Sequence, residues 1–409
     1  MSTVLIVGAG LAGLALAQAL KKHNIPFKIF EKDERQDFRA QGYRLRIVRD
    51  GILALQYALT PELWALFEKT TAAFDPAVPG ARLDAISGEP LAAPSFQGGK
   101  PQGMQNAMYG DMQPYTVDRA TMREVLLTEL DDVHFGKEFK YYETSEDEVV
   151  AYFGDGSSYN GALLVGADGV WSRVRKQLLP NYSLIDTGMR IIYGKTPITP
   201  VFEKSIAQSL LAGMSLVRDK DTLAPKTMLL EAIRFPQADT ISEFKLPHDY
   251  MYWVLVINKD LCALSEQGGS SMDHAQTAEL SLSLSKDWDQ SVRAPLEYQD
   301  MLESSILRIF SANPDMPAWE PSPKVTLLGD AIHAMPPTGG MGVNTALRGA
   351  GDLARRIVET RLEGTNADLI AQYEEDLRVF ARGPLALSWQ GGRMAFNAKP
   401  IEECEVISM

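Results

Sequence analysis

Cysteine, histidine and clustered positive charge are all scarce in this sequence. Its two cysteines, Cys262 and Cys404, cannot form a disulfide framework, and no CxxC pair or Cys/His cluster predicts a metal site. Such a chain is typical of a reducing compartment. The formal net charge of −13 argues against a nucleic-acid partner, because neutralising phosphates requires clustered Lys and Arg.

Long apolar runs are also missing, and none in the sequence is long enough to span a bilayer. No lysines precede the first apolar stretch, as they would in a signal peptide. Three glutamates, Glu402, Glu403 and Glu405, argue against a C-terminal anchor. We therefore expect a cytoplasmic protein that has neither a membrane anchor nor a bound metal ion.

The beginning of the chain has the pattern of a βαβ unit. Val4 to Val7 is a short, continuous apolar run, which is typical of a strand buried on both faces. An Ala/Leu-rich helix over 11–22 and a second strand over 26–30 follow it. This unit predicts an α/β fold.

The middle third of the chain has a different character. Residues 73–113 are rich in Pro, Gly and Ala and have little periodicity, so we interpret them as an excursion over a substrate region. The aromatic and β-branched stretch over 250–258 favours a strand in a mixed sheet. We expect helices over 119–130, 172–179, 275–284, 295–309 and 345–362, and strands over 149–153, 163–165 and 324–328.

A glycine loop joins the first strand to the first helix. Gly8 permits the tight turn, Gly10 lets the backbone approach a pyrophosphate, and Gly13 lets the helix pack closely on the strand. The phosphate would lie at the helix N-terminus, where free N–H groups and the dipole favour an anion. Glu31, at the end of the second strand, suits a pair of ribose hydroxyls. The loop alone does not separate FAD from NAD.

A second motif favours FAD. Gly329 and Asp330 follow the strand at 324–328, and the glycine-rich segment 339–342 feeds the next helix. An Asp at the carboxyl end of a strand can accept hydrogen bonds from a polyol, and backbone N–H groups in such a loop can hold negative charge. A nicotinamide dinucleotide has no ribityl polyol to offer that Asp, whereas FAD has one.

A third motif also lies between a strand and a helix. It comprises Asp168 and Gly169, with Ser172 and Arg175 shortly after. By itself it is explained as a capped turn, in which the Asp168 side chain accepts from local backbone N–H groups.

Together the three motifs resemble the class A FAD-dependent monooxygenases, the para-hydroxybenzoate hydroxylase-like group. The stretch GDAIHAMPPTGGMGVNTAL is most similar to fungal secondary-metabolism and tetracycline-inactivating members, and the resemblance covers nearly the whole chain. It implies that the glycine loop holds the FAD adenylate and that Asp168-Gly169 serves the FAD and NAD(P)H pyrophosphates. Gly329-Asp330 would hold the ribityl chain.

The resemblance also implies a set of cofactor residues. Arg119 and Arg123 both fit the arginine that contacts FAD in the family, and the choice between them stays open. Arg44 stands where the family usually has small residues. The full predicted FAD set is Gly8, Gly10, Leu11, Ala12, Gly13, Glu31, Lys32, Gly42, Arg44, Arg119, Arg123, Asp168, Gly169, Gly329, Asp330, Pro337, Gly339, Gly340, Met341, Gly342, Val343 and Asn344.

Catalytic residues are less well marked. Some phenol-hydroxylating relatives carry an Arg and a Tyr over the flavin in the substrate sheet, which makes Arg190, Tyr193 and Tyr252 the candidates here. A plain structural role is the alternative for each of them. His333 is the one histidine inside a motif, where we expect it to order the proline loop.

The resemblance implies a Rossmann-like FAD-binding domain of the GR2 type with an inserted mixed-sheet substrate domain. We expect the FAD-binding domain over 1–72, 111–185 and 318–395, the substrate domain over 73–110 and 186–317, and a C-terminal tail over 396–409. No second GxGxxG appears, so a separate NADPH domain is not expected.

The expected activity is an NAD(P)H-driven monooxygenase, a monomer or homodimer, that inserts one oxygen atom from O₂ into an aromatic or polycyclic small molecule. The reaction would be a hydroxylation or an epoxidation, in secondary metabolism. The alternatives are an FAD oxidase or dehydrogenase without oxygen insertion, and a flavin-binding protein without turnover.

Overall fold

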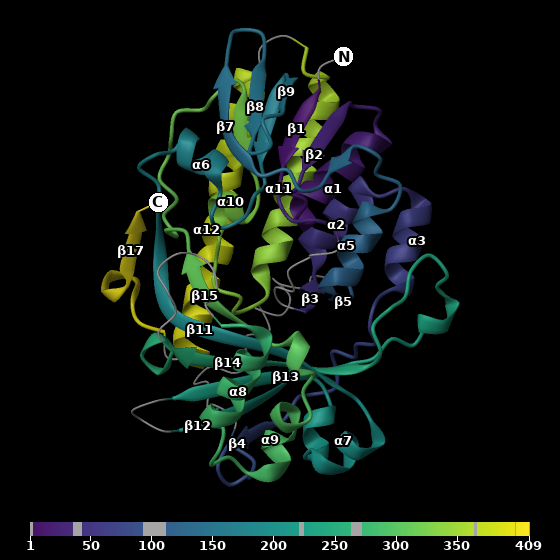
Figure 1. The fold of residues 1–409 in the computed structure, drawn as a ribbon, viewed down its shortest axis with the longest axis vertical. Helices are drawn as coiled ribbons and strands as arrows, with labels where there is room; N and C mark the ends of the chain where they lie inside the picture. Colours follow the sequence, from purple (N-terminus) through teal and green to yellow (C-terminus); the bar gives the residue numbers. More distant parts are fainter. Residues whose placement is uncertain are drawn as a thin grey trace.

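The computed structural model describes residues 3–35, 43–92, 112–220, 225–262, 272–363, 366–396 and 398–408. Within these ranges the chain forms two large sheets, one above the other in Figure 1, with helices against both. No helix of these ranges has the length and apolarity needed to cross a membrane.

The upper sheet is parallel and five-stranded. Its strands β1 and β10 are fully buried, because helices and the small antiparallel sheet cover them. The order across the sheet is β16 (Val325–Leu327), β10 (Leu163–Gly166), β1 (Val4–Val7), β2 (Phe27–Phe30) and β6 (Val133–His134). The chain leaves this sheet after β10 and returns to it with β16, so segments far apart in sequence meet at one edge.

Helices rich in Ala, Leu and Gly pack on the upper sheet and on one another, since small residues allow close approach. Glycine also sets one of these approaches, because a Cβ at Gly13 would overlap the carbonyl oxygen of Gly8. The helices of this part are α1 (Leu11–Lys22), α2 (Arg49–Ala58), α3 (Pro61–Lys69), α5 (Arg119–Leu127), α6 (Arg173–Leu178), α10 (Asp330–His333), α11 (Met341–Thr360) and α12 (Ala367–Phe396).

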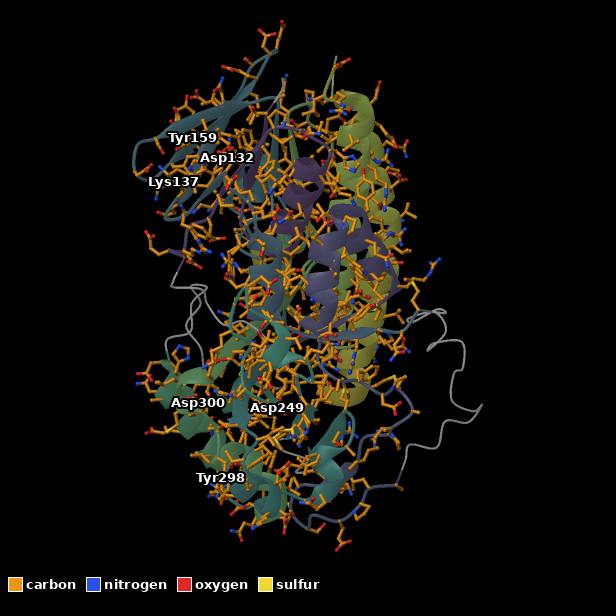
Figure 2. All side chains as sticks on the ribbon, turned by 90° about the vertical axis from the view of Figure 1, so that its right-hand side faces the viewer. Asp132, Lys137, Tyr159, Asp249, Tyr298 and Asp300 are labelled. Atoms are coloured by element: carbon orange, nitrogen blue, oxygen red, sulfur yellow. The ribbon has the colours of Figure 1, made fainter. Side chains whose placement is uncertain are left out.

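Two small antiparallel sheets complete the upper part. One pairs β3 (Arg44–Ile47) with β5 (Tyr115–Asp118), and the other contains β7 (Phe139–Thr144), β8 (Val149–Phe153) and β9 (Ser158–Gly161). The second packs on β2, where the ring centroids of Phe30 and Phe153 are 4.4 Å apart. Lys137 and Tyr159 mark this end of the molecule in Figure 2, opposite Tyr298 and Asp300.

The lower sheet has mixed strand directions. Its order is β15 (Ser305–Ser311), β11 (Ser183–Pro197), β14 (Tyr250–Asn258), β13 (Lys226–Ile233), β12 (Ser215–Asp219) and β4 (Arg82–Asp84), with β17 (Glu405–Ser408) paired to β11. Its lower face packs on α7 (Pro200–Ser205), α8 (His274–Leu284) and α9 (Gln290–Glu297). Trp253 is buried on that face, against Gly194 of the neighbouring strand.

The predicted fold class is confirmed, but some elements differ. The helix expected over 295–309 is wrong: α9 ends at Glu297, a 3₁₀ turn covers Met301–Glu303, and β15 follows. The physical reason is that 305–311 pairs antiparallel with β11, which outweighs local preference. The helix expected over 345–362 begins earlier, at Met341. Residues 405–408, within the predicted tail, form β17.

Candidate active site

The three predicted motifs meet at the carboxyl edge of the upper sheet. Gly8 follows β1 with φ = +110°, and a Cβ atom there would overlap the carbonyl oxygen of Ala167 after β10. A Cβ atom at Gly329, after β16, would lie 3.5 Å from the Cβ atom of Ala12. Ligands of open α/β sheets bind at this edge, so the topology alone makes it the candidate site.

Two helix N-termini open onto this edge without a side-chain cap. Helix α1 begins after Gly10 and α11 begins after Gly340, and neither has an acidic residue in its first turn. Gly340 adopts φ = +65°, which permits the turn into α11. Free N–H groups at two dipole ends favour an anionic ligand, such as a pyrophosphate or a reduced ring system.

Glu31 lies beside the glycine loop. Its carboxylate accepts from the N–H of Ala9 at 2.8 Å and from the N–H of Asp33 at 3.1 Å. Each bond uses a different oxygen, so acceptor capacity remains for ribose hydroxyls. Lys32, also predicted here, is exposed.

The two candidate arginines of α5 have different surroundings. Arg123 is 3% exposed, and its Nε donates to the carbonyl oxygen of Ala9 at 3.2 Å, which fixes the glycine loop. The Arg119 guanidinium makes no hydrogen bond or ion pair with the described residues. Burial lowers the pKa of Arg119, while Asp330 and two tyrosines, Tyr193 and Tyr252, partly offset that effect. Arg123 therefore belongs to the loop end of the site and Arg119 to the end facing the lower sheet.

Tyr193 and Tyr252 come together on the upper face of the lower sheet. They lie on the paired strands β11 and β14, with ring centroids 6.4 Å apart and an interplanar angle of 26°. Burial raises the pKa of both phenols, so both are neutral at ordinary pH. The site thus has an aromatic floor opposite the glycine-lined edge.

Arg190 is placed apart from the two tyrosines. Side chains alternate along a strand, so Arg190 and Tyr193 of β11 point to opposite faces. The Arg190 guanidinium donates to both oxygens of Asp186 at 3.0 Å, and Arg308 joins the same carboxylate at 2.9 Å. These contacts fit the structural alternative for Arg190.

Asp168 and Asp330 differ in what they already bind. The Oδ2 atom of Asp168 accepts from the N–H of Arg173 at 2.8 Å, and burial raises the Asp168 pKa. Its Oδ1 atom is buried and has no partner within the described ranges. Asp330 is exposed, and no described residue donates to its carboxylate. Both therefore retain acceptor capacity toward a ligand.

Arg175 was not in the predicted cofactor set, yet it connects two of the motifs. Its guanidinium donates to the carbonyl oxygens of Ala331 at 2.6 Å and Val170 at 2.7 Å. It is almost fully buried, so it holds the Asp168 loop against the Asp330 loop. The sequence signal was its place in the helix that follows Asp168-Gly169.

Asn344 fixes the glycine-rich segment. Its amide donates to the carbonyl oxygens of Arg46 at 2.9 Å and Gly340 at 3.0 Å, and accepts from the N–H of Val48 at 2.8 Å. Its role is thus to position the loop. Pro337 and Gly339 are exposed, Met341, Gly342 and Val343 are half-buried, and Gly42 lies outside the described residues.

Two buried charge clusters join the upper part to the lower sheet. In the first, Glu231 of β13 pairs with Arg44 and with Arg46, the latter at 2.7 Å. In the second, Asp118 accepts from Tyr250 at 2.9 Å and lies 3.3 Å from the Lys195 ammonium. Asp118 also caps α5, so this cluster orients the helix that carries Arg119.

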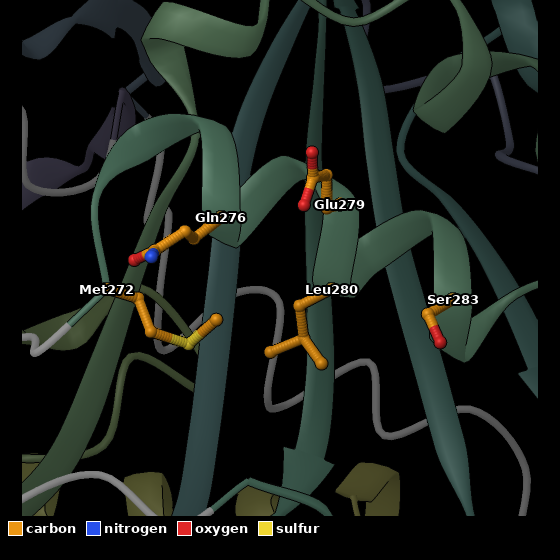
Figure 3. A pocket seen from close by; sticks show the side chains of 5 residues that line it. All are labelled: Met272, Gln276, Glu279, Leu280 and Ser283. Atoms are coloured by element: carbon orange, nitrogen blue, oxygen red, sulfur yellow. The ribbon is translucent and has the colours of Figure 1, made fainter.

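His333 is buried, and neither ring nitrogen has a hydrogen-bond partner among the described residues. Burial lowers its pKa, so the ring is neutral. A hollow of about 500 Å³ lies elsewhere, on α8 beneath the lower sheet (Figure 3), and is not part of this site.

The open donors and acceptors fit a dinucleotide with a polyol. The two uncapped helix ends and Asp168 follow strands of the upper sheet at its carboxyl edge, and the Asp168 Oδ1 atom has no partner among the described residues. Arg119 is close enough to Asp330 for their charges to interact. Comparisons with known proteins agree. A family model described as FAD binding domain matches residues 307–387, and one described as NAD(P)-binding Rossmann-like domain matches residues 6–70.

The dual O-methyltransferase/FAD-dependent monooxygenase elcB of Phaeosphaeria nodorum is 37% identical over 99% of this chain. The chain is a homologue of FAD-dependent monooxygenases. The match covers 47% of elcB, so this chain spans about half the length of that relative. Its match to the FAD-dependent monooxygenase thnD of Trichoderma harzianum is 25% identical and covers 97% of this chain and 95% of thnD.

Among solved structures, a Photorhabdus luminescens protein described as an FAD-containing monooxygenase superposes with a TM-score of 0.77 and 27% identity. The match covers 97% of this monooxygenase homologue and 98% of that chain. The predicted resemblance and the predicted cofactors, FAD and NAD(P)H, are thereby confirmed.

Proposed function

We propose that the chain is an NAD(P)H-driven FAD monooxygenase that inserts one oxygen atom from O₂ into an aromatic or polycyclic small molecule. One observation carries the proposal. The glycine-lined edge of the upper sheet faces the Tyr193–Tyr252 floor, and the unpaired Arg119 guanidinium lies between them. A flavin at the edge and a flat apolar molecule on the floor would then be in contact.

The FAD assignment follows the chemistry of each part. Glu31 and Arg123 belong to the adenosine end, the N-terminus of α1 to the pyrophosphate, and Asp330 to the ribityl chain. The N-terminus of α11 and Arg119 belong to the ring. Bound FAD would supply the redox chemistry, taking a hydride from NAD(P)H and using O₂.

The polypeptide supplies placement and exclusion of water. The lower sheet closes the site from beneath through Tyr193, Tyr252 and its apolar neighbours. Removing water strengthens the electrostatic effect of Arg119 on a negative charge at the ring. We propose that residues 1–72, 111–185 and 318–395 bind FAD and that 73–110 and 186–317 bind substrate.

The name of elcB gives two activities, an O-methyltransferase and an FAD-dependent monooxygenase. We propose that this chain corresponds to the monooxygenase part. The fungal relatives favour a substrate from secondary metabolism. A cytoplasmic location and a monomeric or homodimeric state are part of the same proposal.

The test is a spectrum of the purified protein, followed by NADPH consumption with a panel of phenols, indoles and polyketides under ¹⁸O₂. The monooxygenase predicts a flavin spectrum and one labelled oxygen atom in the product. An oxidase would give hydrogen peroxide without label in the product. A flavin-binding protein without turnover would consume no NADPH with any compound, which would contradict the proposal.

A further inference from the structure

A basic hollow lies on the surface beside the Asp168 loop. It has a volume of about 550 Å³ and lies between α6 and β7. Its lining residues are Lys140, Trp171, Arg173, Lys176 and Gln177.

The hollow is positive on a protein that is strongly acidic. Glu138 pairs with Lys140 at 2.8 Å and with Arg173 at 2.6 Å, so one carboxylate is shared by two cations. The Lys176 ammonium is exposed and has no ion pair within the described ranges. Lys140, Arg173, Lys176 and Glu138 together carry a net charge of +2. A local positive potential of this kind attracts a multiply charged anion.

The walls of the hollow are held in place before any ligand binds. The Gln177 side chain exchanges two hydrogen bonds with the Tyr142 backbone, at 3.0 and 2.7 Å. Arg173 donates to the carbonyl oxygen of Phe139 at 2.9 Å as well as pairing with Glu138. Fixed side chains lose less conformational entropy when they bind a ligand.

Trp171 adds an aromatic surface to the cations. Its ring meets that of Phe310 edge to face, with centroids 4.8 Å apart and an interplanar angle of 74°. The indole is thereby fixed, yet it stays partly exposed and lines the hollow. Indole rings stack on planar bases, and phosphates bind clustered Lys and Arg. A phosphorylated nucleoside combines the two.

We propose that this hollow binds the adenosine 2′-phosphate end of NADPH, with the adenine on Trp171 and the 2′-phosphate between Lys140, Arg173 and Lys176. The inference rests on the proposed function, in which FAD occupies the glycine loop and NAD(P)H must bind elsewhere. Phe310 belongs to β15 of the lower sheet, so the hollow adjoins the junction of the two sheets. NADH lacks the 2′-phosphate, so the protein prefers NADPH.

The test compares 2′,5′-ADP with 5′-ADP on the FAD-loaded protein by titration calorimetry, which needs no turnover. The variants are Lys140→Gln, Lys176→Gln and Trp171→Phe, and Lys286→Gln is the control, because Lys286 is an exposed lysine beneath the lower sheet. We expect each lysine variant to weaken 2′,5′-ADP binding on the order of tenfold. Binding of 5′-ADP should change little, and the KM for NADPH should rise without a change in the KM for NADH.

Equal binding of the two nucleotides, unaltered by Lys140→Gln and Lys176→Gln, would overturn the inference. A parallel loss of both nucleotides in the two lysine variants would place a pyrophosphate in the hollow and would also overturn the 2′-phosphate assignment, whereas Trp171→Phe should weaken both because both carry adenine. Selective 2′,5′-ADP binding without NADPH oxidation would support the hollow while contradicting the proposed function.

Discussion

At the scale of single residues, the site depends on side chains that keep unused hydrogen-bonding capacity. Glu31 supports the glycine loop through Ala9 and still has acceptor positions for a ribose. Replacing it with Ala should weaken FAD binding by roughly tenfold or more, because a charge-assisted hydrogen bond contributes about 1.5–3 kcal/mol. The FAD dissociation constant of the refilled apoprotein measures this. The control is Glu279→Ala, which removes an exposed carboxylate on α8 beneath the lower sheet. An unchanged constant in Glu31→Ala would make the ribose assignment wrong.

Asp330 and Asp168 allow a separation of binding from folding. The Asp330 carboxylate receives no hydrogen bond from the described residues, so Asp330→Ala should lower FAD retention with little change in the Tm of the apoprotein. Asp168 accepts from the N–H groups of Arg173 and Val174 at the start of α6. Asp168→Ala should therefore lower the apoprotein Tm, because losing these hydrogen bonds costs about 1 kcal/mol of the free energy of unfolding. Thermal unfolding and flavin content, measured on both variants, test whether Asp330 acts in FAD binding and Asp168 in folding. The opposite pattern would contradict these roles.

The residues also show where sequence reasoning stops. Arg119 and Arg123 are one helical turn apart, so no sequence pattern distinguishes their surroundings. The structure does distinguish them, because Arg123 donates to the carbonyl oxygen of Ala9 and Arg119 does not. The sequence could have predicted that Arg190 and Tyr193 lie apart, because an odd spacing along a strand places two side chains on opposite faces. The Tyr193–Tyr252 pair was predicted only as two candidates, since their proximity depends on the register of β11 with β14.

At the scale of elements, a buried carboxyl couples α12 to the upper sheet. Glu374 accepts from the Thr326 hydroxyl of β16 at 2.8 Å, and burial raises its pKa from 4.5 to about 7. The folded state therefore binds this proton more tightly than the unfolded state. The contribution of Glu374 to the free energy of unfolding is therefore fully present below about pH 4.5 and is lost as the pH rises through about 7.

We expect the free energy of unfolding to fall by up to about 3 kcal/mol from this group between those pH values. Glu374→Gln cannot titrate, so its stability should lack that decline. Denaturant unfolding at pH 5, 6, 7 and 8 measures both profiles. Glu375→Gln, at an exposed position of the same helix, is the control. Parallel profiles for the wild type and Glu374→Gln would contradict the prediction.

The elements themselves were predictable where burial and chain pattern agree. The βαβ unit, α5, α8 and β14 were found because periodicity or apolar runs mark them. Strand β15 was assigned to a helix because its hydrogen-bond partner β11 lies more than a hundred residues earlier in sequence. Strand β9, with the polar sequence SYNG, has no apolar signal and forms through pairing with β8.

At the scale of the whole molecule, buried charges join the upper part, through β3, to the lower sheet. Glu231 is the counter-ion of both Arg44 and Arg46, and Arg46 also lies 3.4 Å from the Phe74 ring centroid. Glu231→Gln would leave two neighbouring guanidinium groups buried without their carboxylate. Removing one partner of a buried pair costs about 3–5 kcal/mol. We expect a Tm lowered by several degrees and, in calorimetry, separation of the single transition into two.

The matched control is Glu203→Gln, which removes one of the two carboxylate partners of the more exposed Arg234, at 2.7 Å, and leaves Asp249 at 3.5 Å. Exposed ion pairs contribute about 0–1 kcal/mol, so its Tm should stay near that of the wild type. Equal decreases in Tm for the two substitutions would contradict the prediction that losing the buried Glu231 carboxylate costs more than losing an exposed one.

The interleaved order of the upper sheet has a consequence for synthesis on the ribosome. Strand β10 lies between β1 and β16 in space, yet the ribosome makes all of the lower sheet's central strands before β16 emerges. At about 5–20 residues per second, the glycine loop waits on the order of tens of seconds for the last strand of its own sheet. During that interval the carboxyl edge lacks Asp330 and the N-terminus of α11. The central strands of the lower sheet are therefore all synthesised before the carboxyl edge of the upper sheet can be completed, which happens only near the end of translation.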